Sequence, residues 1–119
     1  MILLYDGTFE GFLSLVYEVY YKKLKPTKIY KTLPNEILFE EILEINSSKE
    51  SGIKVLNAIK TKFPKEILEK ILNIFMCDSK EFEMALLEYI IIGFKEVKQL
   101  YNINNSCVFY LNYLEKELF

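Results

Sequence analysis

The sequence contains no histidine, arginine or tryptophan, and all fifteen of its basic residues are lysines. Without imidazole, the chain cannot form a Ser-His-Asp or Cys-His nucleophilic system, and it cannot form a zinc site that needs histidine ligands. Without guanidinium, it lacks bidentate phosphate clamps and the commonest side-chain contact to guanine. Any anion must therefore be bound by lysine, by backbone N–H groups or by helix N-termini.

Cysteine is also scarce: Cys77 and Cys107 form no CxxC pair, so an iron–sulfur or structural zinc site is not indicated. We predict that both pack as small core hydrophobes with reduced thiols. The chain does not open with a basic and then an apolar segment, and its longest stretch free of charged or polar side chains, about residues 89–94, is too short to span a membrane. We therefore expect a cytoplasmic protein with no membrane association, no metal, no cofactor and no catalytic residue.

Hydrophobic residues make up 51% of the 119-residue chain, and its formal net charge is only −2. This length and composition predict one domain, residues 1–119, with a substantial core. Periodicity predicts an α+β fold that is predominantly helical, with about five helices and a small three-stranded sheet. We expect strands near residues 2–5, 28–31 and 41–45. We expect helices at about residues 9–24 and 48–62, from Pro64 onward, from a cap at Asp78 or Ser79 to Leu100, and from Ser106 onward.

Single residues refine these predictions. Thr8 is a plausible N-cap of the first helix, and Ser47 with Glu50 three residues later resembles a capping box for the second. Spacing assigns Tyr20 to the inward face of the first helix. Gly93 lies within a helix that is apolar all round, and this predicts the close approach of a neighbouring helix.

The segment YYKKLKPTKIYK, residues 20–31, combines lysines with tyrosines. Lysine can neutralise phosphates and tyrosine can stack on unpaired bases, so this segment is a candidate nucleic-acid surface. Alternatively, its lysines compensate a helix C-terminus and continue into a solvated loop, which we favour because arginine is absent and the net charge is negative. The candidate residues are Lys22, Lys23, Lys25, Lys28, Lys31 and Tyr30.

Two other polar sets allow a chemical and a structural interpretation. The run Asp6-Gly7-Thr8 before a helix could hold an anion, or it could be a turn with a capping threonine. The carboxylates Glu36, Glu40, Glu41 and Glu44 could bind Mg²⁺ or act as acids and bases, or they could protect a strand edge by their charge. We favour the structural interpretation of both, because no GxGxxG, GxxxxGK[ST] or DxD-like pattern accompanies them.

Aromatic residues are more numerous than one face of each helix requires. Tyr17 and Tyr21 form a second stripe on the first helix, and Phe109 and Tyr113 lie around the apolar positions of the last. Exposed aromatic patches mark partner surfaces, so these four are candidate partner-binding residues, with burial on all sides an equal alternative. The chain stops at Phe119 in mid-pattern, and we expect it to be the N-terminal part of a longer protein.

The opening YDGTFEGFL, which continues into SLVYEVYY, resembles a bacterial family of DNA-metabolism proteins of unknown function. The resemblance covers residues 4–21 and extends more faintly through Leu38-Phe39 and SSKESGIKVLNAI. It implies a DNA-linked setting, a longer parent protein and a radical-SAM DNA modification or repair protein encoded nearby, and it contains no catalytic signature. The residues that carry it are Asp6, Gly7, Thr8, Phe9, Gly11 and Phe12.

These observations leave three hypotheses of function. The first is a non-catalytic accessory or interaction domain of a DNA modification or repair system, which binds a radical-SAM protein. The second is a nucleic-acid-binding domain that contacts DNA through residues 22–31. The third is part of an enzyme whose catalytic residues lie beyond Phe119. A homo-oligomer is compatible with each of them.

Overall fold

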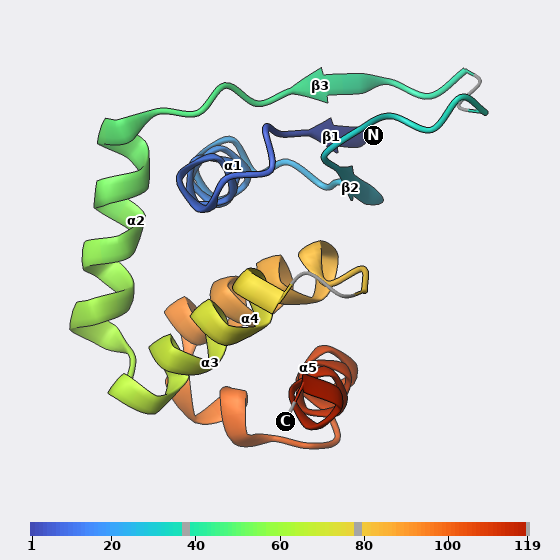
Figure 1. Cartoon of the computed structure of the whole chain (residues 1–119). Coiled ribbons are helices and arrows are strands. Elements are labelled where there is room, and N and C mark those ends of the chain that lie inside the picture. Colours follow the sequence, from blue (N-terminus) through green and yellow to red (C-terminus); the bar gives the residue numbers. More distant parts are fainter. Residues whose placement is uncertain (37–38, 78–79, 119) are drawn as a thin grey trace. The chain divides into compact units, whose positions relative to one another are not determined.

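The computed structural model describes residues 1–36, 39–77 and 80–118 (Figure 1). Over these residues it contains five α-helices and one small three-stranded sheet, which confirms the predicted α+β, predominantly helical fold. The chain divides into two compact units, Met1–Asn57 and Ala58–Phe119. The sheet and the first helix belong to the first unit, and the last three helices belong to the second.

All three strands are parallel, and each is only three residues long: β1 (Ile2–Leu4), β2 (Lys28–Tyr30) and β3 (Ile42–Glu44). The strand order is β2-β1-β3, so β1 is central and the other two are edges. Leu3 aligns with Ile29 on one side and with Leu43 on the other. Leu3 is completely buried, as a central strand of a parallel sheet requires. The three predicted strands are confirmed, each one or two residues shorter than expected.

Helix α1 (Phe9–Lys22) follows β1 and leads to β2 (Figure 1). It ends two residues before the predicted boundary, because Lys23 adopts the left-handed conformation with φ 53° and ψ 42°. In this conformation the Lys23 N–H donates to the carbonyl oxygen of Val19 and closes the helix. The buried side of α1 consists of Gly11, Phe12, Leu13, Ser14, Leu15, Val16 and Val19.

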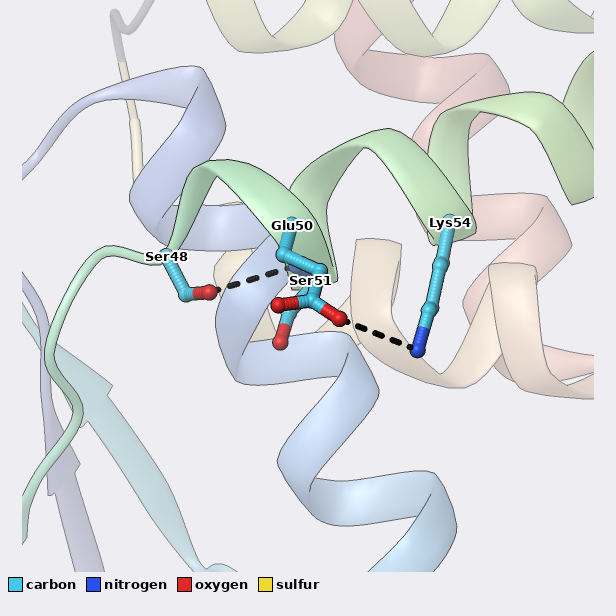
Figure 2. A network of polar contacts seen from close by, with 4 residues as sticks. All are labelled: Ser48, Glu50, Ser51 and Lys54. Atoms are coloured by element: carbon cyan, nitrogen blue, oxygen red, sulfur yellow. Dashed lines mark hydrogen bonds and ion pairs between the residues drawn. The ribbon is translucent and has the colours of Figure 1, made fainter.

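Helix α2 (Lys49–Lys62) is capped by Ser48, whose Oγ accepts a hydrogen bond of 3.2 Å from the backbone N–H of Ser51 (Figure 2). The predicted capping box at Ser47 is therefore wrong. The Ser47 hydroxyl donates instead to Oε2 of Glu10 at 2.9 Å, so it is used to tie this segment to α1.

The second unit contains α3 (Lys65–Cys77), α4 (Glu83–Lys95), the 3₁₀ helix η1 (Val97–Tyr101) and α5 (Ser106–Leu118). The predicted single helix up to Leu100 is wrong, because Glu96 is extended with φ −157° and ψ 108° and separates α4 from η1. The predicted caps, Asp78 and Ser79, lie outside the described residues. The N-cap of α4 is Phe82, which makes no side-chain capping bond.

The close approach predicted at Gly93 is confirmed, and its partners are side chains. A Cβ on Gly93 would lie 2.6 Å from Cζ of Phe63 and 2.8 Å from Cδ1 of Leu100. In a continuous helix, Leu100 would lie about 10 Å further along the axis than Gly93. The extended residue Glu96 thus turns the chain back, and this return buries Leu100 against α4.

The prediction that both cysteines are core residues is correct for Cys107, which is buried, and wrong for Cys77, which is exposed. The reason is helical spacing: Cys77 ends α3 outside the buried stripe that Ile67, Ile71 and Ile74 form. Both cysteines are free thiols.

Replacing Lys23 by glycine should stabilise the protein by about 0.5–1 kcal/mol, because glycine adopts the left-handed conformation without the strain of a Cβ. The matched control Lys22→Gly lies one residue earlier, inside α1, and should destabilise the protein by about 1 kcal/mol. Denaturant unfolding of both variants and the parent protein measures these changes. Equal effects of the two substitutions would contradict the assigned helix end.

Candidate functional site

The residues of the DGTFEGF motif build the turn that starts α1. Oδ1 of Asp6 accepts hydrogen bonds from the backbone N–H of Thr8 at 2.9 Å and from its hydroxyl at 2.6 Å. Oγ1 of Thr8 accepts one from the N–H of Gly11 at 2.9 Å. A Cβ on Gly11 would lie 2.0 Å from Oδ1 of Asp6, so no larger residue fits without displacing the carboxylate. The interpretation of Asp6-Gly7-Thr8 as a turn with a capping threonine is confirmed.

Two aromatic members of the motif help to form the core. Phe12 is completely buried, and its ring meets that of Tyr5 edge to face, with centroids 5.8 Å apart. Phe9 is half-buried in the first turn of α1. The motif therefore positions α1 and anchors it beside the sheet.

A second polar contact fixes α1 against the start of α2. The buried Ser14 hydroxyl accepts a hydrogen bond of 2.8 Å from the N–H of Ser48. The same oxygen lies 2.8 Å from the carbonyl oxygen of Glu10 and 3.1 Å from that of Ser48. Together with the Ser47–Glu10 bond, this contact sets which face of α1 stays open to solvent.

On that open face lie three tyrosines, Tyr17, Tyr20 and Tyr21, which we call the tyrosine patch. The Tyr21 ring centroid lies 4.4 Å from that of Tyr17 and 5.3 Å from that of Tyr20. Tyr20 is 48% exposed and Tyr21 is 65% exposed, whereas Tyr17 is half-buried. The assignment of Tyr20 to the inward face is wrong. Spacing of three and four residues fits both faces near the end of this helix, so periodicity did not separate them.

Charged side chains border the tyrosine patch. Nζ of Lys54 on α2 lies 5.8 Å from the Tyr17 ring centroid and 3.6 Å from Oε1 of Glu50, its neighbour one turn earlier (Figure 2). On α1, Nζ of Lys22 pairs with Oε2 of Glu18 at 2.8 Å. Exposed pairs of this kind contribute little to stability. Lys54 thus places a charged group directly beside the Tyr17 ring.

The other two predicted partner-binding residues lie in the second unit. Phe109 is 66% exposed and Tyr113, one turn later on α5, is 45% exposed. Nζ of Lys80 lies 5.2 Å from the Tyr113 ring centroid. The intervening Tyr110 is held by its hydroxyl, which donates to the carbonyl oxygen of Glu81 at 2.5 Å.

The five lysines of the candidate nucleic-acid segment are all exposed, and Tyr30 is half-buried. Lys22 is engaged with Glu18, and the Cδ of Lys31 lies 3.2 Å from the Cβ position of Gly7. Within the described residues, no ion pair holds Lys23, Lys25 or Lys28. This exposure fits a solvated loop and also fits a surface that binds phosphates.

The four candidate carboxylates, Glu36, Glu40, Glu41 and Glu44, are exposed, and Glu44 lies on the edge strand β3. In the parts of the chain that the structure describes, no three cysteine, aspartate or glutamate side chains gather as metal ligands would. Within the same parts, every helix is too short or too polar to cross a membrane.

Sequence reasoning missed a buried polar group in the second unit. Tyr89 is completely buried, and its hydroxyl has no hydrogen-bond partner among the described residues. Burial raises the pKa of Tyr89, and nearby Tyr101, Glu115 and Cys107 raise it further. Helical spacing places Tyr89 on the inward side of its helix, but it carries no information on a partner for the hydroxyl.

The amine of Lys70 lies 5.3 Å from the Tyr89 ring centroid and donates a hydrogen bond to Oδ1 of Asn112. Burial lowers the pKa of Lys70, and the carboxylate of Glu115 opposes that shift. The ring and the amide thus compensate a partly buried cation.

No protein-family model matches this chain, and neither does any curated protein or solved structure.

Replacing Tyr89 by phenylalanine should leave the core intact and stabilise the protein by about 1 kcal/mol at neutral pH, because it removes a buried hydroxyl that has no partner within the described part of the chain. The raised pKa of Tyr89 adds a pH dependence. Below pH 10, the pKa of an unperturbed tyrosine, the Tyr89 side chain is protonated in both the folded and the unfolded state. As the pH rises further, only the unfolded state releases the proton, so the folded state of the parent protein loses stability.

The unfolding free energy of the parent protein should thus fall by up to about 1.4 kcal/mol per pH unit above pH 10 relative to Tyr89→Phe. Denaturant unfolding of both proteins at neutral and alkaline pH measures this difference. The same pH dependence of the unfolding free energy in both proteins would contradict the burial of the Tyr89 hydroxyl.

Proposed function

We propose that this chain is a non-catalytic protein-interaction module and that the tyrosine patch of α1 is its docking surface. The observation that carries the proposal is the exposure of Tyr20 and Tyr21 while their rings contact each other. Removing the surface of large aromatic side chains from water is favourable, so a partner that covers these rings gains binding free energy. Tyrosine is among the residues that dominate binding energy at protein interfaces.

The arrangement of the rings also supports binding. Because Tyr17 and Tyr20 both contact Tyr21, each ring has fewer rotamers to lose when a partner arrives. Lys54 of the Glu50–Lys54 pair lies beside the Tyr17 ring, and the paired Glu18 and Lys22 follow Tyr17 and Tyr21 along α1, so charged groups are available for the polar rim that typical interfaces have.

The resemblance of residues 4–21 suggests the setting: a cytoplasmic DNA modification or repair system with a radical-SAM protein as partner. In that setting the DGTFEGF motif orients α1, and α1 presents the tyrosines. The chemistry of the reaction would then belong to the partner, which agrees with a chain that lacks histidine and arginine.

Replacing Tyr20 and Tyr21 together by serine should weaken binding to a radical-SAM protein of the kind that the resemblance implies by at least tenfold, because both anchors are lost. Isothermal titration calorimetry with the two purified proteins measures the affinity. The matched control is Ile103→Ser, which removes a side chain that is 65% exposed in the second unit and should change the affinity less than twofold.

No binding by the parent protein would exclude this partner. Binding that survives the tyrosine substitutions but is lost in Phe109→Ser would assign docking to α5 instead.

The exposed lysines favour a second function, binding of single-stranded nucleic acid, since Lys23, Lys25 and Lys28 have no ion-pair partner among the described residues. In that case Lys23→Glu with Lys25→Glu should lower the affinity for a fluorescent single-stranded oligonucleotide at least tenfold. Lys95→Glu with Lys98→Glu makes the same charge change on exposed residues of the second unit and should have a smaller effect. Fluorescence anisotropy measures both.

Affinity should also fall steeply with added salt, because bound lysines release counterions from the phosphates. Affinity that does not change with salt, or an equal loss in both variants, would remove this function.

A further inference from the structure

The sheet of the first unit has two open edges. Among the residues that the structure describes, both β2 and β3 pair only with β1, in the strand order β2-β1-β3. The outer side of an edge strand carries backbone donors and acceptors that can pair with a strand of another molecule. Proteins usually prevent such pairing by placing charged side chains on the edge.

The two edges carry charges of opposite sign. Lys28 is exposed on β2, and the exposed Lys25 and Lys31 flank that strand. Glu44 is exposed on β3, and the exposed Glu40 and Glu41 precede it. Charge protects an edge against another edge of the same sign, since like charges on neighbouring strands repel. It gives no protection when a lysine edge meets a glutamate edge.

The edge strand β3 also exposes apolar surface. Ile42 is 41% exposed, and Phe39, three residues earlier, has its whole side chain in solvent. A charged edge that served only to repel other strands would not need these two side chains. Their position beside the strand provides apolar area that an added strand can cover.

We propose that a second copy of this chain docks on this edge, with β2 of one copy pairing with β3 of the next. The internal register supports such pairing. Lys28 and Ile42 both align with Ile2, and Tyr30 and Glu44 both align with Leu4. If β2 of the second copy pairs with β3 in a parallel register that sets Lys28 opposite Ile42, its Tyr30 lies opposite Glu44. Its Lys28 is then the diagonal neighbour of Glu44.

Symmetric pairing is disfavoured by the same charges. Two β3 edges would bring Glu44 of both copies together, and two β2 edges would bring the Lys28 side chains together. The contact is therefore heterologous, because β2 of one copy pairs with β3 of the next. Each copy in a pair leaves one edge strand free for a further copy, so the assembly can grow or close into a ring. This inference does not depend on the tyrosine patch or on the radical-SAM partner.

Sedimentation velocity of the purified chain tests the proposal. At about 100 µM protein and low salt the parent chain should self-associate, and added salt should reverse this because it screens the charges. Lys28→Glu alone and Glu44→Lys alone should each be monomeric. An equimolar mixture of these two variants should associate again, and so should the double variant Lys28→Glu/Glu44→Lys, because both restore opposite signs at the contact.

Lys60→Glu and Glu69→Lys, which alter exposed charges on α2 and α3, serve as matched controls and should behave like the parent chain. A monomeric parent chain under these conditions overturns the proposal. Association that survives both edge variants overturns it, as does a mixture that stays monomeric. Association lost in Tyr20→Ser/Tyr21→Ser but retained in the edge variants overturns it in favour of the tyrosine patch.

Discussion

The Asp6 carboxylate binds both polar hydrogens of Thr8, and the Thr8 hydroxyl in turn accepts the N–H of Gly11. These bonds connect the end of β1 to the first turn of α1 within six consecutive residues. Because an α-helix is rigid, the direction set in its first turn determines which side chains lie against the sheet and which meet solvent thirteen residues later, at the end of α1. The buried Phe12 and the exposed Tyr21 are both consequences of this turn.

The residues of the DGTFEGF motif therefore orient the helix. Gly11 is required because its Cβ would occupy the space of the Asp6 carboxylate, and the buried Ser14 ties the helix to Ser48.

Features that depend on neighbours in the sequence could be predicted, and features that depend on distant packing could not. Thr8 is recognisable as an N-cap because it bonds an amide three residues away. The end of α4 was missed because it depends on Leu100 returning to a space that Phe63 and Gly93 define. Tyr20 was misplaced for a related reason, since helical spacing fits two faces and only the packing partners select one. The Tyr89 hydroxyl has no partner among the described residues, and helical spacing carries no information on such a partner.

The sheet has only three short parallel strands, so two of its three strands are edge strands. Parallel strands pair slightly less strongly than antiparallel ones, and strands of three residues contribute few hydrogen bonds each. A central strand between two short edge strands is thus stabilised mainly by buried side chains, such as Phe12, whose ring contacts that of Tyr5 at the end of β1. Lysine on one edge and glutamate on the other make the sheet polar across its width. The charges on each edge repel a strand of like charge and attract a strand of opposite charge. They therefore favour contact between β2 and β3 of two copies and do not prevent contact altogether.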